Sequence, residues 1–228
     1  MKILGLIPAR GGSKGILRKN VREIAGKPLI VWTIEAALAS PQLDAVIIST
    51  DDEEIADVAR RAGALVPFMR PHHLATDEAP GIAPVLHAME EMPDYDAILL
   101  LQPTSPLRTS DDIQGLLTFA TKAKTPSVVS VCEPDSHPNW IYTLENDGRL
   151  KPLFDKDATA RRQDLPPVFT LNGAMYFAEA RWLQEKRAFI GAETLGYAMP
   201  PERSIDIDTA LQWHLAEFLL SNQGAHDL

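Results

Sequence analysis

Apolar runs and amphipathic stretches alternate along most of the chain. The runs typical of buried strands, which lack the polar alternation of a half-exposed strand, are residues 3–7, 45–50, 64–66, 97–101 and 128–131. Helical patterns lie between them at residues 28–38, 53–61, 85–89 and 111–120. We expect Ser110 to cap the last of these helices. This order predicts an α/β fold with a doubly wound, mostly parallel sheet, which binds ligands beyond the carboxyl ends of its strands.

The pattern changes between residues 133 and 169, where prolines and charges are frequent. Asn146-Asp147-Gly148 stands between two short apolar stretches and predicts a hairpin turn. We interpret 133–169 as an inserted subdomain that projects from a single domain of residues 1–228. The alternation then resumes with a strand at 173–177 and a helix at 181–186. A final helix is expected to bury an apolar side made of Ala210, Leu211, His214, Leu215, Phe218 and Leu219.

Composition narrows the class of protein. The net charge of −9 argues against general affinity for nucleic acid, which needs a basic surface. The single cysteine, Cys132, excludes an intramolecular disulfide and fits a reducing compartment as a buried structural thiol. The chain opens on its first predicted strand, without a signal peptide or a membrane-length apolar run. We therefore expect a cytoplasmic protein with no nucleic-acid or membrane partner.

A glycine-rich basic loop follows the first strand. The basic residues Lys2, Arg10, Lys14, Arg18, Lys19 and Arg22 all precede the first acidic residue, Glu23. Glycines let backbone N–H groups approach an anion, and Arg and Lys add charge-assisted hydrogen bonds. The loop matches neither GxxxxGK[ST] nor GxGxxG, which argues against a kinase, an ATPase or a dinucleotide oxidoreductase. It predicts a polyphosphate site of another lineage, although a solvated surface loop is the alternative.

Polar clusters follow the carboxyl ends of three predicted strands, at residues 10–12, 49–52 and 102–108. Because these ends meet at one edge of a parallel sheet, together they predict a site. Near the end of the chain, an extended Ser204–Thr209 segment would place Asp206 and Asp208 on one face. Two such carboxylates suit Mg²⁺, which completes its shell with water and substrate phosphates. The alternative is that Asp208 only caps the last helix.

Six stretches that span nearly the whole chain resemble the acylneuraminate cytidylyltransferases, the CMP-sialic acid synthetases. They are IPARGGSKGILRKN (7–20), STDDEEIA (49–56), RPHHLATD (70–77), LLQPTSPLRT (100–109), LNGAMYF (171–177) and SIDIDT (204–209). The resemblance implies a Rossmann-like nucleotidyltransferase fold. It also implies that the anomeric hydroxyl of a nine-carbon 2-keto sugar acid attacks the α-phosphorus of CTP, with Mg²⁺ required. The products are the CMP-sugar and pyrophosphate. A homodimer is implied too, with the inserted region as its dimerisation subdomain reaching the neighbour's site.

The resemblance also implies roles for individual residues. Arg10, Lys19, Asp206 and Asp208 are the expected catalytic set, and the two aspartates are the expected metal ligands. The expected nucleotide contacts are Arg10, Gly11, Gly12, Ser13, Lys14, Lys19 and Asn20. The expected sugar contacts are Gln102, Thr104, Ser105, Arg162, Asn172, Tyr176 and Phe189, with Arg162 aimed at the partner's site. The general base stays open between metal-bound water or hydroxide and one of the aspartates.

One departure from the family bears on the substrate. Gly81 stands where a serine that contacts the sugar is often expected, so legionaminate and pseudaminate stay open beside N-acetylneuraminate. A nucleotidyltransferase for Kdo (2-keto-3-deoxy-manno-octonic acid) or a sugar phosphate is an alternative that a substrate panel separates. A non-catalytic nucleotide-binding regulator is a more remote one, because it needs the basic loop but not the aspartate pair.

Overall fold

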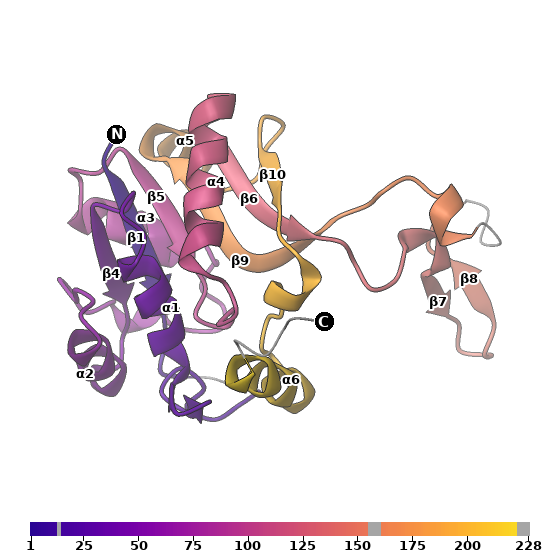
Figure 1. Cartoon of the computed structure of the whole chain (residues 1–228), viewed down its shortest axis with the longest axis horizontal. Coiled ribbons are helices and arrows are strands. Elements are labelled where there is room, and N and C mark those ends of the chain that lie inside the picture. Colours follow the sequence, from indigo (N-terminus) through magenta and orange to yellow (C-terminus); the bar gives the residue numbers. More distant parts are fainter. Residues whose placement is uncertain (13–14, 155–160, 223–228) are drawn as a thin grey trace.

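The computed structural model describes residues 1–12, 15–154 and 161–222. Its centre is a six-stranded sheet with the strand order β10-β6-β9-β5-β1-β4 (Figure 1). The strands of this sheet are β1 (Ile3–Pro8), β4 (Ala45–Ser49), β5 (Ala97–Leu101), β6 (Ser127–Cys132), β9 (Thr170–Glu179) and β10 (Leu195–Ala198). Strand β9 runs antiparallel to both of its neighbours, and the other pairs are parallel. The predicted mostly parallel sheet is therefore confirmed.

Helices cover both faces of this sheet, as a doubly wound fold requires. The helices are α1 (Leu29–Leu38), α2 (Glu53–Arg61), α3 (Ala83–Glu91), α4 (Ser110–Ala123), α5 (Ala180–Lys186) and α6 (Ala210–Ser221). Apolar residues of α1, α2 and α4 pack in one buried cluster with the strands, and those of α3 and α5 pack in a second. Cys132 is buried and free, as expected. None of the helices described is long and apolar enough to cross a membrane.

Several local expectations need correction. Thr109, not Ser110, caps α4: its side chain accepts a hydrogen bond from the backbone N–H of Asp112 at 3.2 Å. The predicted strand at 64–66 is reduced to one isolated bridge between Ile47 and Leu65. Strand β10 and the small hairpin formed by β2 (Glu23–Ile24) and β3 (Lys27–Pro28) were not expected. All three are short segments whose pairing depends on distant strands or on a two-residue turn.

The expected apolar side of α6 is wrong. The helix buries Trp213, Ala216 and Leu220, whereas Leu211 is 79% exposed and Phe218 is 62% exposed. Both sides of α6 are apolar, so its periodicity alone does not decide which side packs. The buried side is chosen by the cluster that α6 joins, together with the apolar residues of the basic loop.

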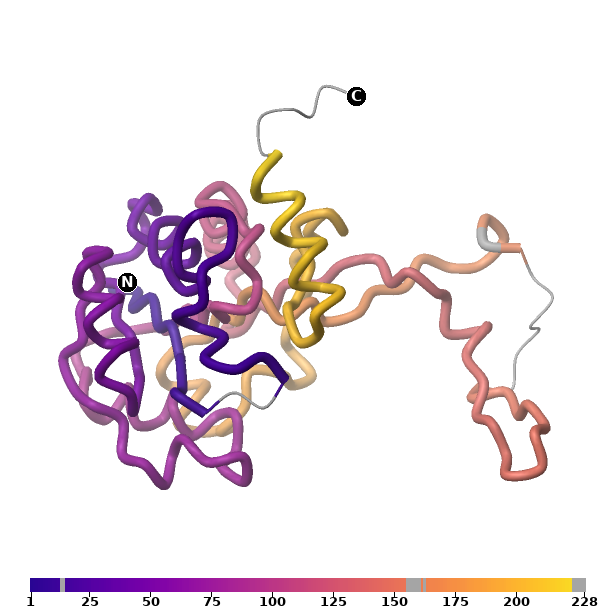
Figure 2. Tube along the Cα trace, turned by 90° about the horizontal axis from the view of Figure 1, so that it is seen from below, coloured from indigo at the N-terminus to yellow at the C-terminus, as the bar shows by residue number. Residues whose placement is uncertain are grey.

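Residues 133–154 and 161–169 extend from the body as an arm that carries β7 (Tyr142–Leu144) and β8 (Leu150–Pro152) (Figures 1 and 2). These strands form the hairpin expected around Asn146-Asp147-Gly148, and Gly148 has a φ of 84°. Two segments connect the arm to the body, one that leaves β6 and one that leads back to β9 (Figures 1 and 2). The arm therefore stands apart from the sheet and presents its own surface.

Candidate active site

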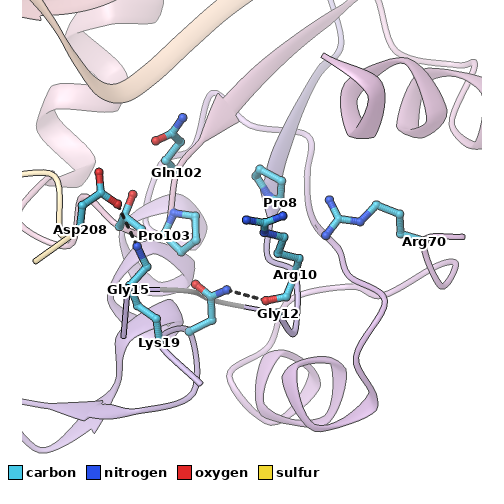
Figure 3. Close-up of a pocket in the computed structure, with 11 residues that line it drawn as sticks. Pro8, Arg10, Gly12, Gly15, Lys19, Arg70, Gln102, Pro103 and Asp208 are labelled. Carbon is cyan, nitrogen blue, oxygen red and sulfur yellow. Dashed lines mark hydrogen bonds and ion pairs between the residues drawn. The ribbon is translucent and has the colours of Figure 1, made fainter. Parts of the chain in front are cut away.

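A cavity of about 410 Å³ lies where the chain leaves the carboxyl ends of β1 and β5 (Figure 3). We call it the cationic cavity; its lining residues are Pro8, Arg10, Gly12, Gly15, Lys19, Asn20, Arg70, Gln102, Pro103, Thr104 and Asp208. The polar cluster that follows β4 also reaches this edge, because Asp51 Oδ1 accepts a hydrogen bond from the Gly11 N–H at 3.1 Å. The three predicted clusters are thus brought together.

Arg10 and Asn20 are neighbours in the wall of the cationic cavity. The Asn20 side-chain amide is buried and donates a hydrogen bond to the Arg10 carbonyl at 3.1 Å. The Arg10 guanidinium forms an ion pair with Asp77 at 2.6 Å. This pairing neutralises Arg10 when no anion is bound, so an entering phosphate exchanges one anionic partner for another.

Lys19 connects the basic loop to the acidic segment near the end of the chain. Its side chain is only 13% exposed, and Nζ donates to the Ile207 carbonyl at 2.7 Å and to Asp208 Oδ1 at 3.1 Å (Figure 3). The Asp208 side chain is 71% exposed. A buried ammonium and an accessible carboxylate therefore meet at the same point of the cavity wall.

Asp206 is half-buried behind this pair. Burial raises the pKa of its carboxyl group and the charge of Asp208 raises it further, against the lowering effects of a Thr104 hydrogen bond and of Lys19. Its Oδ1 is buried without a hydrogen-bond partner among the described residues. Since an unpartnered buried carboxylate oxygen is costly, a cation bound here would relieve that cost.

Gly173 allows Asp206 to approach Gln102. Its φ is 75°, and a Cβ atom there would lie 3.0 Å from Asp206 Oδ2 and 3.2 Å from Gln102 Oε1. The residue lies in β9 beside the register irregularity of the β6–β9 pairing. A side chain at this position would separate the two polar groups, so the bulge and the glycine together form this part of the site.

No role in the site was predicted for Arg70, although it is the first residue of one of the motifs. It is 5% exposed, and its Nε and Nη2 form no hydrogen bond within the described residues. Burial lowers the pKa of its guanidinium, and Asp51 Oδ1 lies 3.6 Å from Nη2. A buried guanidinium with free donors in a cavity wall is suited to bind an oxygen acceptor of a ligand.

Two basic residues of the loop have structural contacts instead. Arg18 donates to Asp52 at 2.5 and 2.9 Å and also pairs with Glu54, which ties the loop to the first turn of α2. The Arg22 guanidinium carbon lies 5.1 Å from the centroid of the Trp213 ring. The positive charge of the loop is therefore divided between the lining of the cationic cavity and contacts that hold the loop against the protein.

A second cavity of about 330 Å³ shares Gln102 with the cationic cavity. We call it the apolar cavity; its lining residues are Gly81, Ile82, Leu100, Gln102, Tyr176, Arg187, Ala188, Phe189 and Ile190. It contains Gln102, Tyr176 and Phe189, three of the expected sugar contacts. The rings of Tyr176 and Phe189 pack with their centroids 5.5 Å apart.

The other expected residues lie elsewhere. Thr104 lines the cationic cavity, and Ser105 is fully buried. Asn172 lines a further cavity together with Asp206, and its amide accepts a hydrogen bond from Ser130 Oγ at 2.6 Å and donates one to Ser204 Oγ at 2.9 Å. Gly11 and Gly12 lie in the loop, and Gly12 lines the cationic cavity. Ser13 and Lys14, and the side chain of Arg162, are outside the described residues.

A mostly parallel α/β sheet with a cation-lined cavity at its carboxyl edge is the architecture of a nucleotide-binding protein. Comparison with solved structures agrees on the fold. A CMP:2-keto-3-deoxy-manno-octonic acid synthetase complexed with CTP superposes with a TM-score of 0.75, covering 98% of this chain and 100% of that chain at 17% identity. At this identity the likeness concerns the fold alone.

Sequence comparison defines the family. The family model described as Cytidylyltransferase matches residues 4–206. CMP-N,N′-diacetyllegionaminic acid synthase of Legionella pneumophila is 39% identical over 99% of this chain and 99% of its own length. N-acylneuraminate cytidylyltransferase of Escherichia coli is 37% identical over 94% of this chain, which spans 51% of that protein. Pseudaminic acid cytidylyltransferase of Campylobacter jejuni is 34% identical over 96% of both chains. The chain therefore belongs to the cytidylyltransferase family, in its acylneuraminate cytidylyltransferase branch, as its motifs predict.

Proposed function

We propose that the protein transfers a cytidylyl group from CTP to the C2 hydroxyl of a nonulosonate, a nine-carbon 2-keto sugar acid. The observation that carries this proposal is the pair of cavities that meet at Gln102. One is lined by cations next to two carboxylates, and the other is largely apolar. Relatives named for legionaminic, acylneuraminic and pseudaminic acids match nearly all of this chain, which supports a substrate of this class.

The proposed reaction is a single displacement at phosphorus. The C2 hydroxyl oxygen forms a bond to the α-phosphorus, the bond from that phosphorus to the bridging oxygen breaks, and pyrophosphate leaves with this oxygen. The hydroxyl proton passes to water or to one of the aspartates. Arg10 and Lys19 bind the triphosphate and stabilise the negative charge that develops on the departing pyrophosphate. Arg70 adds its free donors to the same nucleotide.

Asp206 and Asp208 would hold a divalent cation, which we propose is Mg²⁺. The unpartnered Oδ1 of Asp206 and the exposed carboxylate of Asp208 fit such an ion. The described residues contain no group of three or more His, Cys, Asp or Glu side chains that could hold a metal by themselves. This suits Mg²⁺, which commonly takes one or two carboxylates and finds its other ligands in water and phosphate. The ion would supply charge neutralisation to the transferred phosphoryl group.

The proposal is tested by measuring pyrophosphate and CMP-sugar formed from CTP and Mg²⁺. The acceptors are N-acetylneuraminate, N,N′-diacetyllegionaminate, pseudaminate and Kdo, with a blank that contains no sugar. We expect equal amounts of the two products with at least one nonulosonate. Asp208→Ala should reduce the rate by about 10²–10³, whereas the exposed Asp111→Ala should not. Turnover with Kdo alone, or release without any sugar, would contradict the proposal.

We also propose that the arm packs against a second copy of the chain. Apolar side chains exposed on the arm include Ile141, Leu144, Leu150, Leu153, Phe154 and Phe169. The outer side of α6 adds Leu211, Leu215 and Phe218. Exposed apolar surface of this extent is typical of an interface.

Sedimentation equilibrium tests the proposed dimer. We expect a dimer for the natural chain and a shift toward monomer for the double variant Leu144→Ser/Leu150→Ser, which changes two exposed residues of the arm. The matched control Leu65→Ser changes an exposed leucine on the body and should leave the dimer intact. A monomeric natural chain at all concentrations would refute the dimer.

A further inference from the structure

We infer that Arg187 selects the sugar by binding an acylamino group on the side chain of the nonulosonate, within an apolar cavity that favours a methyl-terminated tail over a hydroxylated one. The inference rests on the proposed function and adds a residue that none of the six motifs contains. It concerns the C7–C9 side chain of the sugar, which is attached to the ring at C6.

The position of Gln102 orients the sugar. Gln102 lines both cavities, so an acceptor bound beside the triphosphate extends from the cationic cavity into the apolar cavity. The acceptor's C2 hydroxyl must lie near the nucleotide, because it attacks the α-phosphorus. The C5 acylamino group, which lies across the ring from C2, and the C7–C9 side chain, which is attached at C6, then reach the space between Tyr176, Phe189 and Arg187.

The lining of the apolar cavity disfavours a polyhydroxylated tail. Ile82, Leu100, Ala188, Phe189 and Ile190 present hydrocarbon to the ligand. Hydroxyl groups that leave water for the hydrocarbon part of this surface lose hydrogen bonds that these five residues do not replace. Acetyl and terminal methyl groups gain from the same transfer, so this lining separates two classes of nonulosonate.

Arg187 supplies a hydrogen-bond donor at this surface. Its side chain has no ion pair or hydrogen bond in the part of the chain that the structure describes. The other basic residues of α5 are engaged: Arg181 pairs with Glu185 at 2.8 Å, and Lys186 Nζ lies 5.6 Å from the centroid of the Trp182 ring. A guanidinium with free donors beside an apolar wall matches an acylamino group, whose carbonyl accepts while its methyl packs.

The turn that carries Arg187 is rigidly held. Arg187 has a φ of 50° and donates its backbone N–H to the Leu183 carbonyl at 2.9 Å. The next carbonyl, that of Ala188, accepts from Trp182 Nε1 at 2.8 Å, and the Phe189 carbonyl accepts from Ser127 Oγ. A turn fixed at three successive residues holds the Arg187 backbone in place, which leaves only the side chain to be ordered on binding.

Gly81 also lines the apolar cavity. A Cβ atom built there has no heavy atom within 4 Å, so the position leaves room for a substituent of the sugar. The same space lets Gly81→Ser be made without disturbing the fold. That variant narrows the cavity and adds a hydroxyl, which should favour a hydroxylated tail.

The test compares kcat/KM for two probes that share the ring acetamido group. N,N′-diacetyllegionaminate has a second acetamido group at C7 and a C9 methyl, whereas N-acetylneuraminate has a trihydroxylated tail. We expect the natural chain to prefer the first by about tenfold or more. Arg187→Ala should reduce kcat/KM for the first probe by about 10- to 100-fold, with little change for the second. The KM for CTP and the melting temperature should stay unchanged.

The matched control is Arg181→Ala, which removes a positive charge from α5, outside the cavity. It should leave kcat/KM unchanged for both probes. Gly81→Ser should lower the preference in the same direction as Arg187→Ala. Equal losses for both probes in Arg187→Ala, or a natural preference for N-acetylneuraminate, would overturn the inference while leaving the proposed function intact. Absence of pyrophosphate release with every nonulosonate would overturn the proposed function, and the inference with it.

Discussion

The cationic cavity and the apolar cavity share Gln102 but are built in opposite ways. Two cations of the first are already paired, Arg10 with Asp77 and Lys19 with Asp208, so a nucleotide that binds them must replace contacts that exist without it. The second offers Arg187 without such a partner, on a turn fixed by backbone hydrogen bonds. From this difference we infer that negative charge develops in the first cavity during the proposed reaction, whereas the second cavity selects the sugar by shape and by a single donor.

The largest expected effect is that of Arg10→Ala. Loss of a guanidinium that stabilises a transferring phosphoryl group commonly costs about 10³ or more in rate. We expect such a loss in kcat/KM for CTP, with an unchanged circular dichroism spectrum because Arg10 is half-exposed and pairs only at the surface. The control Arg61→Ala removes an exposed cation from α2. Near-normal turnover of Arg10→Ala would remove the basic loop from the mechanism.

Asp206→Asn should separate activity from stability. The natural carboxylate is half-buried with one oxygen unpartnered, so replacing its charge should stabilise the ligand-free protein, by about 2–4 °C in melting temperature if the gain is about 1 kcal/mol. The same change should lower the rate by about 10². Differential scanning fluorimetry should also show that added Mg²⁺ and CTP stabilise the variant less than the natural chain. A variant that is less stable and equally active would contradict the proposed role.

A smaller, pH-dependent effect should come from the ion pair that anchors the acidic segment. Burial alone would raise the pKa of Asp112, but hydrogen bonds from Arg203, at 2.8 and 2.9 Å, and from Thr109 outweigh it and lower the pKa below its ordinary value. A lowered folded-state pKa adds stability above the unfolded-state pKa of about 4, and this stability disappears as the pH falls through the folded-state value.

Urea unfolding between pH 3 and 7 measures this contribution. Asp112→Asn should lower the free energy of unfolding by about 1–3 kcal/mol at pH 7, and the difference from the natural chain should shrink below pH 4. The exposed neighbour Asp111→Asn serves as the control. A difference that stays constant down to pH 3 would show that the pair contributes through packing rather than charge.

Much of the fold could be predicted because its signals are local. Strand β5 is an uninterrupted apolar run, and α2 has capping residues and one apolar side. The Asn146-Asp147-Gly148 turn is equally self-contained. By contrast, α6 is apolar on both sides, so only its packing against the basic loop decides that Trp213 is buried and Phe218 is exposed.

The site residues that could be predicted are those that lie in recognisable sequence motifs. Arg10, Lys19 and Asp208 lie in charged segments with a recognisable pattern, and the structure brings them to one cavity. Arg70 gave no charge signal of its own, because its role depends on burial without a partner. Arg187 directly follows the short helix α5, in a segment that matches none of the motifs. Only the packing of this helix end beside Tyr176 brings Arg187 to the apolar cavity. Asn172 lies in a motif as well, and the structure adds that its amide connects β6 to Ser204.

The most direct test of separate roles for the two cavities is one set of steady-state measurements. It compares the natural chain, Arg10→Ala and Arg187→Ala, with the concentrations of CTP and of each nonulosonate probe varied. We predict that Arg10→Ala lowers kcat/KM for CTP without changing the ratio of kcat/KM between the two sugars. We also predict that Arg187→Ala changes that ratio and leaves the KM for CTP unchanged. If both variants changed the sugar ratio and the CTP parameters alike, the two cavities would not have separate roles and the account would be wrong.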